Sequence, residues 1–449
     1  MAGHGLAPET AHGSITMFRI SGSFALVLGL LVQNSSFAQQ QTPQPSSPFQ
    51  PPLGFPNAAP RTDAVVPVDL RQPASGAAIS IPKTAWARLL EQDPRALTPL
   101  VNQTLQASRR GADWLARANT TKGLFTPGLD PATATEIPGS PLGQVQAAWA
   151  LAKASAAFGD ERYEMRALQA LLACLEDTTE DAEDPQARHS SAPSAVVSRP
   201  AGTATLLVAI ASLEKPPAEL LDKAEALARY LCKPAVLASL ETVSKADPSI
   251  TALVSHALLV SHRHRPAAWK LEAARKAFGI NLTAEALQKA MPWPLIAAAE
   301  MSRHDPSFTS RVHALSETLL ATQIDKLDPR HPEWFGGWSA IQTVAGAEPA
   351  QPTCSATANA LMALAEAAAV TRRDGDLNRH QRLKDAMDRG TQFLLQLQYT
   401  DANTQHFADW YRPRLTGGFR PGPKDTVLCL EQNHGALMAL LGCARDSAP

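Results

Sequence analysis

The chain has 449 residues, of which 45% are hydrophobic and 18% charged, and its formal net charge is −1. A charge so close to zero supplies no basic face for nucleic acid or anionic lipid, so neither is expected as a partner. The cysteines are odd in number and contain no C-x-x-C pair, which argues against a disulfide framework. They are Cys174, Cys232, Cys354, Cys429 and Cys443.

The N-terminal segment has the features of an export signal. Phe24 to Val32 (FALVLGLLV) is an apolar run that is too short to span a bilayer, which takes about 20 residues. Arg19 precedes the run, and Ser36-Phe37-Ala38 supplies the small residues of a cleavage site. Residues 1–38 are therefore predicted to be a signal peptide, with Met17 as an alternative start. The mature protein is expected in the periplasm or outside the cell, with no membrane attachment after cleavage.

Residues 39–82 are rich in Gln, Pro and Ser, a composition that does not bury enough apolar surface to order itself. This segment is predicted to be a disordered linker. Residues 83–449 are predicted to form one all-α domain, because Ala and Leu recur at three- and four-residue spacing while alternating β-branched runs are almost absent. An acidic run from Glu176 to Asp184 is expected to be a solvated, disordered loop.

The apolar spacing resolves the domain into six pairs of helices. The pairs are Leu100–Ala118 with Leu142–Ala157, Glu161–Leu175 with Gly202–Leu213, Ala218–Cys232 with Ser249–Ser261, Ala267–Phe278 with Pro294–Ser302, Ser307–Gln323 with Cys354–Val370, and Leu377–Gln398 with Thr426–Cys443.

The two helices of each pair differ in character. The first carries the charges, as a helix with one solvent face does, whereas the second is apolar nearly all round and is therefore expected to be buried. Six such pairs predict an (α/α)6 toroid with an inner and an outer ring. The long connections all lead from a first helix into a second, so they should gather on one rim, where sites are usually built.

A short unit occurs twice along the chain. Arg110-Gly111-x-x-Trp114-Leu115 is followed by Gly123-x-Phe125, and Arg389-Gly390-x-x-Phe393-Leu394-x-x-x-Gln398 is followed by Gly417-Gly418-Phe419. A partial copy ends in Gly336-Gly337-Trp338. Each copy joins the end of an amphipathic helix to a glycine-aromatic turn, which indicates a repeat of helical hairpins.

This unit resembles the QW repeat of squalene and oxidosqualene cyclases. Asn119 stands where the glutamine of the first copy would be, and Phe125 replaces the tryptophan. The resemblance implies an α/α toroid of the terpene cyclase and protein prenyltransferase superfamily. The cyclase family protonates its substrate through Asp-x-Asp-Asp, which this chain lacks, so cyclisation is not expected.

Protein prenyltransferase β subunits are a second comparison, because they bind zinc with Asp, Cys and His at the starts of their last inner helices. Cys354, Glu431 and His434 are the matching candidates here, with Glu431 in place of the missing aspartate. Three protein ligands would leave an open catalytic position on zinc. Apart from this zinc alternative, no cofactor is expected.

The last hairpin also looks like that of secreted bacterial toroids that act on carbohydrate. On that interpretation Glu431, His434 and Asp409 are the candidate catalytic residues, since glycosidases use paired carboxyl groups. The candidate ligand-binding residues are Trp334, Trp338, Trp410, Tyr411 and Arg420. Packing is the alternative for Trp338 and Phe419, and a core position is the alternative for His434.

Three functions therefore remain open from the sequence. The first is a binding or scaffold module whose rim pocket takes an isoprenoid-like or carbohydrate ligand. The second is a carbohydrate-active enzyme of glycosidase or lyase type that uses rim carboxylates. The third is a zinc-dependent transferase, and whether the chain is an enzyme is left undecided.

Overall fold

The computed structural model describes residues 85–93, 96–192, 197–247, 249–279, 290–339 and 350–447. The predicted signal peptide and linker, residues 1–82, lie outside the described residues. Within these ranges the six predicted hairpins are confirmed. The outer helices are α2 (Pro99–Ala118), α4 (Glu161–Glu176), α6 (Ala218–Cys232), α9 (Ala268–Phe278), α12 (Thr309–Leu320) and α14 (Leu377–Leu397). The inner helices are α3 (Pro141–Phe158), α5 (Arg199–Ile210), α8 (Ser249–His264), α11 (Trp293–Met301), α13 (Cys354–Arg373) and α16 (Leu430–Asp446).

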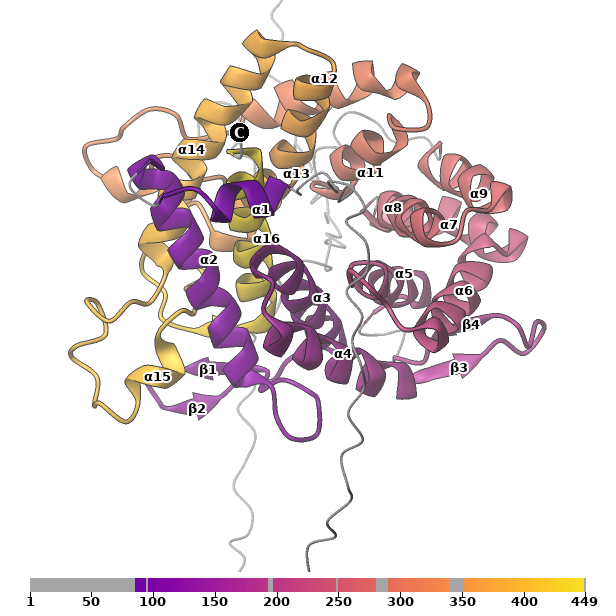
Figure 1. Ribbon diagram of the computed structural model, residues 1–449, viewed down its shortest axis with the longest axis horizontal. Helices are drawn as coiled ribbons and strands as arrows, with labels where there is room; N and C mark the ends of the chain where they lie inside the picture. The colour runs from indigo at the N-terminus through magenta and orange to yellow at the C-terminus, as the bar shows by residue number, and fades with distance from the viewer. Residues whose placement is uncertain are drawn as a thin grey trace, which may run out of the picture.

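The inner helices form a closed ring. Each packs against the next in chain order, and α16 packs against α3, so the last hairpin meets the first (Figure 1). The fold is therefore an (α/α)6 toroid, as the apolar pattern predicts, rather than an open solenoid.

Burial explains why the two rings differ in composition. In α8 every residue from Ser249 to Ser261 is buried, and in α11 every residue from Trp293 to Met301 is buried. A helix enclosed on all sides has no place for an unpaired charge. In the outer α14, by contrast, the buried residues occupy one face, and charged side chains such as Arg382 and Lys384 occupy the other.

Smaller elements were not predicted. Helices α1 (Ala85–Leu90), α7 (Pro234–Ala246) and α15 (Arg412–Leu415) join the twelve ring helices. A sheet of order β2-β1-β5 consists of β1 (Gly128–Asp130), β2 (Thr135–Glu136) and β5 (Leu428–Cys429). The acidic loop holds a hairpin of β3 (Thr178–Glu180) and β4 (Arg188–Ser190). None of the described helices is both long enough and apolar enough to cross a bilayer.

The acidic run is ordered, which corrects its expected disorder. Lys233 on the neighbouring hairpin binds Asp181 at 2.5 Å and Glu183 at 2.8 Å. These ion pairs fix the loop against the start of α7.

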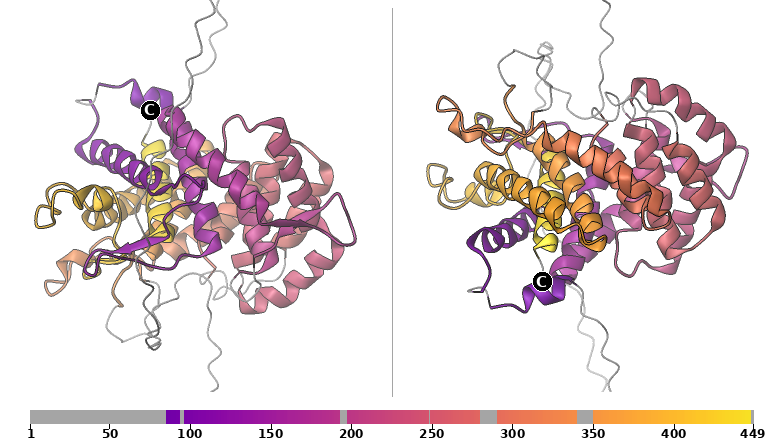
Figure 2. Two further views of the ribbon diagram at one scale, coloured as in Figure 1. Left: turned by 90° about the horizontal axis from the view of Figure 1, so that it is seen from below. Right: turned by 90° about the horizontal axis from the view of Figure 1, so that it is seen from above.

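The two faces of the ring differ. The long connections enter the inner helices at one face, which we call the loop face, and there β1 of the first hairpin pairs with β5 of the last through Gly128 and Cys429. Short turns connect inner to outer helices at the opposite face, which we call the turn face. The side views of Figure 2 show the C-terminal end of α16 at the turn face, away from the strands.

Side-chain clasps tie successive outer helices together. We use the word clasp for an amide side chain at the end of one outer helix, an arginine on the next outer helix, and the glycine-aromatic turn between them. Gln398 Oε1 accepts hydrogen bonds from Arg110 Nε and Nη2 at 3.1 and 3.0 Å. Its Nε2 donates to the carbonyl oxygens of Ala107 and Gly417 at 2.9 and 3.0 Å. This clasp joins α14 to α2 and closes the outer ring.

The same arrangement recurs elsewhere. Gln323 Oε1 accepts hydrogen bonds from Arg389, and Gln323 Nε2 donates to the carbonyl oxygens of Gly336 and Ala386, both at 2.9 Å. A shorter version has Asn119, whose Oδ1 accepts from Arg166 Nη1 at 3.2 Å and whose Nδ2 donates to Gly123 O at 2.7 Å.

The clasps revise the repeat that the sequence indicates. In the sequence, each Arg-Gly pair comes before the glycine-aromatic turn of the same copy of the repeat. In the structure each Arg-Gly pair instead holds the turn of the preceding hairpin: a Cβ on Gly390 would lie 2.7 Å from Trp338, and one on Gly111 would lie 3.1 Å from Phe419. The unit therefore works between neighbouring hairpins.

The aromatic residue of each clasp turn is bound by the inner helix that follows. The backbone N–H of Phe125 donates to Gln144, that of Trp338 to Thr357, and that of Phe419 to Asn433, at 2.7, 3.0 and 2.8 Å. Each acceptor is the fourth residue of its inner helix. The clasps thus fix where the inner helices begin at the loop face.

Candidate functional site

The loop-face junction of α16 and α3 holds a carboxylate. Glu431, in the first turn of α16, is partly exposed, and its Oε1 accepts a hydrogen bond from Ser140 Oγ at 2.7 Å. Gly143 of α3 leaves space for this carboxylate, because a Cβ there would lie 2.5 Å from Glu431 Oε1. Ser140 also caps α3 by accepting from the Gly143 N–H at 3.0 Å. The two helix starts together hold one oxygen of Glu431 in place.

Rings from four inner helices stack below this carboxylate. The His434 ring lies 5.1 Å from that of Trp149, the Trp149 ring 5.9 Å from that of Trp293, and the Trp293 ring 6.0 Å from that of His256. These side chains come from α16, α3, α11 and α8, and all four are buried. Offset aromatic contacts of this spacing are favourable, so the stack fills the middle of the ring with side chains.

Several polar atoms around the stack have no hydrogen-bond partner in the described part of the chain. They are Gln146 Oε1, Trp149 Nε1, His256 Nδ1 and His434 Nε2. Buried polar atoms are normally paired, and an unpaired one marks a place that a ligand or solvent group would occupy. Three of the four lie on α3 and α16. His434 is three residues after Glu431, and Gln146 and Trp149 are three and six residues after Gly143, which faces Glu431, so all three lie within about two turns of it.

Burial controls the charge of the histidines. It lowers the pKa of His434 to about 3. It also lowers the pKa of His256 to about 3, and the positive charge of Arg263 acts in the same direction. Both imidazoles are therefore neutral at neutral pH and serve as hydrogen-bonding groups rather than as acids. Glu431 is left as the partly exposed ionisable group at this junction.

The zinc set predicted from the sequence does not assemble. Cys354 is fully buried at the start of α13, where its Sγ lies 4.0 Å from the Gln432 carbonyl oxygen. Burial raises the pKa of this thiol above its usual range, and the neighbouring Cys429 acts in the same direction, so the thiolate that zinc needs is disfavoured. Among the described residues no three His, Cys, Asp or Glu side chains form a group able to hold a metal ion.

The other candidate residues lie apart from this junction. Asp409 is exposed and pairs with Arg412 at 3.0 Å, and Trp410 beside it is 75% exposed, both in the connection that carries α15. Tyr411 is buried beneath them. The structure therefore does not bring Asp409 together with Glu431 and His434, whereas those two share one face of α16.

The remaining aromatic and basic candidates pack within the clasps. Trp338 is buried and donates from Nε1 to Leu319 O at 3.0 Å, so it seals its hairpin. Trp334 stacks on His331 with ring centroids 4.0 Å apart. Arg420 lies over the Tyr399 ring and donates to the Gln396 carbonyl at 2.9 Å. These contacts place Trp338 and Arg420 in the frame, whereas Trp334 keeps a buried Nε1 without a partner in the described residues.

Sequence reasoning missed Gln146 and Trp149 in α3, and Asp247 before α8. Asp247 Oδ1 caps α8 by accepting from the Ser249 N–H at 3.0 Å, while Oδ2 is buried without a partner in the described residues. The signals were present, because polar Gln146 and Trp149 interrupt an apolar helix three residues apart and so share one face. Asp-Pro-Ser before an apolar run likewise indicates a helix start.

No protein-family model matches the chain, and no curated protein matches it in sequence. Solved structures share its fold. An α-1,6-mannanase of Salegentibacter sp. HEL1_6 is 10% identical with a TM-score of 0.51, and the match covers 76% of this chain and 98% of the mannanase. An unsaturated glucuronyl hydrolase from Streptococcus agalactiae is 13% identical with a TM-score of 0.52, over 80% of this chain and 94% of the hydrolase. A sugar epimerase from a ruminal bacterium is 10% identical with a TM-score of 0.50, over 76% and 98%.

These similarities confirm the α/α toroid and nothing more specific, because identities this low report the fold alone. The terpene cyclase and prenyltransferase kinship expected from the repeated unit has no support among them.

Proposed function

We propose that this chain is a carbohydrate-active toroid that takes a saccharide at the loop-face junction of α3 and α16. The proposal rests on Glu431, a carboxylate held at one oxygen by Ser140 and partly exposed at the mouth of the ring. Glu431 is assigned proton transfer to or from the sugar, the role that carboxyl groups serve in carbohydrate chemistry.

The surrounding side chains suit a polyhydroxylated ligand. Gln146 Oε1 offers an acceptor, Trp149 Nε1 a donor, and neutral His434 a further nitrogen, and none of these atoms has a partner in the described residues. The Trp149 ring itself packs against His434 and Trp293, so Trp149 contributes its N–H and not a free ring face. Sugar sites contain several convergent polar groups, so this polar set favours a saccharide over an isoprenoid.

The fold neighbours add a starting panel. One mannanase structure holds α-1,6-mannotriose, and one glucuronyl hydrolase structure holds the disaccharide dGlcA-GalNAc6S. We expect turnover of a neutral or acidic oligosaccharide from a panel that includes both, measured by release or rearrangement of sugar. Glu431→Gln should lower that turnover by about a hundredfold or more, the usual contribution of a positioned acid or base.

Asp425→Asn is the matched control, because Asp425 is an exposed carboxylate six residues before Glu431 in the same connection. It should leave turnover unchanged. Activity that survives Glu431→Gln would reject Glu431 as the proton-transfer group. Binding of isoprenoids but no sugar, measured by thermal shift, would overturn the carbohydrate assignment in favour of the scaffold alternative.

We further propose that the mature chain is exported, on the basis of the apolar run at Phe24–Val32 and the Ser36-Phe37-Ala38 sequence. The protein recovered from a bacterial host should then begin at Gln39, as N-terminal mass spectrometry would show. Recovery of an intact N-terminus from the cytoplasm would contradict this proposal.

A further inference from the structure

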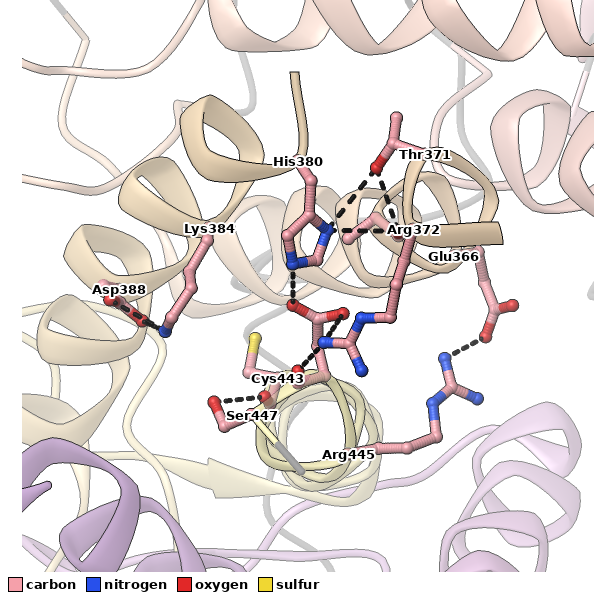
Figure 3. Close-up of polar contacts among 11 residues, drawn as sticks. Glu366, Thr371, Arg372, His380, Lys384, Asp388, Cys443, Arg445 and Ser447 are labelled. Carbon is pink, nitrogen blue, oxygen red and sulfur yellow. Dashed lines mark hydrogen bonds and ion pairs between the residues drawn. The ribbon is translucent and has the colours of Figure 1, made fainter. Parts of the chain in front are cut away.

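The turn face of the ring gathers basic side chains from several inner helices. Arg263 near the end of α8 forms an ion pair with Glu300, and Arg303, just after α11, lies 3.4 Å from the same carboxylate. Arg445 of α16 binds Glu366 of α13 at 2.9 Å, as Figure 3 shows, and Arg303 lies 3.9 Å from Glu366. Two carboxylates, Glu300 and Glu366, thus form the ion pairs of three arginines.

Lys153 adds a fourth positive charge. It lies on the α3 face that carries Gln146 and Trp149, and it interacts electrostatically with Glu366, Arg263, Arg303 and Arg445. Within the described residues its ammonium group makes neither a hydrogen bond nor an ion pair. Burial lowers the pKa of Lys153 to about 8, although Glu366 acts in the opposite direction. The cluster therefore carries two more positive than negative charges.

Asp446 does not neutralise this excess. Its carboxylate binds Arg372 at 2.9 Å and lies 3.7 Å from His380 of α14. Asp446 thus pairs with cations between α13, α14 and α16, and although its charge also acts on Arg445, the charge of Arg372 offsets it.

A cavity opens beside the basic cluster. Its volume is about 180 Å³, and it is lined by the charged residues Arg303, Arg373 and Glu366 and the small apolar residues Ala299, Ala369 and Val370. Arg373 also forms an ion pair with Asp374 at 2.9 Å. A water molecule takes about 30 Å³ of liquid volume, so the cavity accommodates a compact anion with part of its hydration.

We propose that this turn-face cavity binds a compact oxyanion, such as a phosphate, a sulfate or the carboxylate of an acidic sugar, between Arg303 and Arg373 of its wall. Lys153 of the basic cluster is outside that lining and adds positive charge that no carboxylate of the described residues pairs with. Guanidinium groups suit such ligands, because their N–H donors match the spacing of oxyanion oxygens. The site is distinct from the proposed saccharide site, since Glu431 and Arg445 are about 21 Å apart along α16 at 1.5 Å per residue. The proposal does not depend on the carbohydrate assignment.

A competing explanation is that the cations only offset the C-terminal dipoles of the inner helices. The two explanations differ in what an added anion does. If the cations only offset helix dipoles, the cluster is already balanced, and phosphate should act no differently from chloride. If the cluster is an anion site, phosphate should bind with a defined stoichiometry.

The test is isothermal titration of the full chain with inorganic phosphate, sulfate and glucuronate, each at constant ionic strength with chloride as the reference. We expect one saturable site per chain for at least one of these anions, and the preferred anion distinguishes a mineral ligand from an acidic sugar. Lys153→Met and Arg303→Gln should each weaken its binding about tenfold or more. The use of two variants keeps the test decisive if one of them fails to fold.

Arg382→Gln is the control, because Arg382 is an exposed arginine of α14 that pairs with Glu317 on the outer surface. It should bind the anion as the unmodified chain does. Absence of saturable heat with all three anions would overturn the proposal. Equal binding by the Lys153 and Arg303 variants and the unmodified chain would overturn it as well.

Discussion

Gly417→Ala is expected to destabilise the protein by about 3 kcal/mol or more, because it combines backbone strain with a collision at the point where the ring closes. Gly417 has a φ of +99°, in a region that side chains disfavour. A Cβ at this position would lie 2.2 Å from the carbonyl oxygen of Arg110, which belongs to the clasp partner of Gln398. Since backbone atoms cannot move aside as a flexible side chain does, the first and last hairpins must separate.

Two other glycines make this prediction specific. Gly336 occupies the matching position of the Gln323 clasp, with a φ of +85° and a Cβ that would lie 2.3 Å from Arg389 O, so Gly336→Ala should behave like Gly417→Ala. Gly375 has a φ of +76° with no atom within 4 Å of its Cβ, so Gly375→Ala should cost only about 1–2 kcal/mol of strain. Urea midpoints followed by circular dichroism measure all three. If Gly417→Ala and Gly375→Ala lowered the free energy of unfolding equally, the collision within the clasp would contribute nothing to the loss.

Acidification should destabilise the fold between pH 6.5 and about 3, and His256 and His434 are the main cause. Burial lowers the pKa of each to about 3 in the folded state, while the unfolded chain takes up these protons near pH 6.5. The unfolded state therefore binds more protons throughout this window, so stability is full above pH 6.5 and falls as the pH is lowered. Each histidine contributes up to about 1.4 kcal/mol per pH unit.

Glutamine stays neutral at every pH, so the double variant His256→Gln, His434→Gln should flatten the pH dependence between 6.5 and 4.5. The range stops at pH 4.5 because Glu366 also titrates abnormally. Burial raises the pKa of Glu366, but Arg445 and its other cationic neighbours lower it further, to about 2. Protonation of Glu366 therefore removes stability below about pH 4.5 in every variant. His406→Gln, at an exposed position, is the control. An unchanged slope in the double variant would show that other groups govern acid unfolding.

The sequence was sufficient to predict the twelve ring helices and their assignment to two rings. The spacing of apolar residues depends on which faces of a helix meet solvent. In this fold the inner helices are enclosed on all sides and the outer helices have one solvent face, as the fully buried stretch of α8 shows for the inner ring. Helix α7 was missed because it is an additional 13-residue helix that packs on α6, α8 and α9 and belongs to neither ring.

The candidate site was harder to predict. Glu431 and His434 lie one turn apart on α16, so their proximity follows from helix geometry alone. Their contacts with Ser140 and Trp149 do not, because those residues lie 291 and about 285 positions away in the chain and meet only when the ring closes. Asp409 and Trp410 were selected for their chemistry. The spacing of residues around them does not reveal that their connection lies outside the ring.

Ring closure also bears on how the protein is made. Arg110 and Gln398 are 288 positions apart, so the first outer helix emerges from the ribosome long before its clasp partner is synthesised. Until then, α2 and α3 expose apolar faces that the last hairpin will later cover, and the partly made chain is an open arc with an exposed apolar surface at each end. Such an arc is free to pair with a second copy instead of with itself. If a hairpin were gained or lost, the first and last hairpins would no longer match each other. The number of hairpins in a closed ring is therefore constrained, whereas an open helical array can change in length.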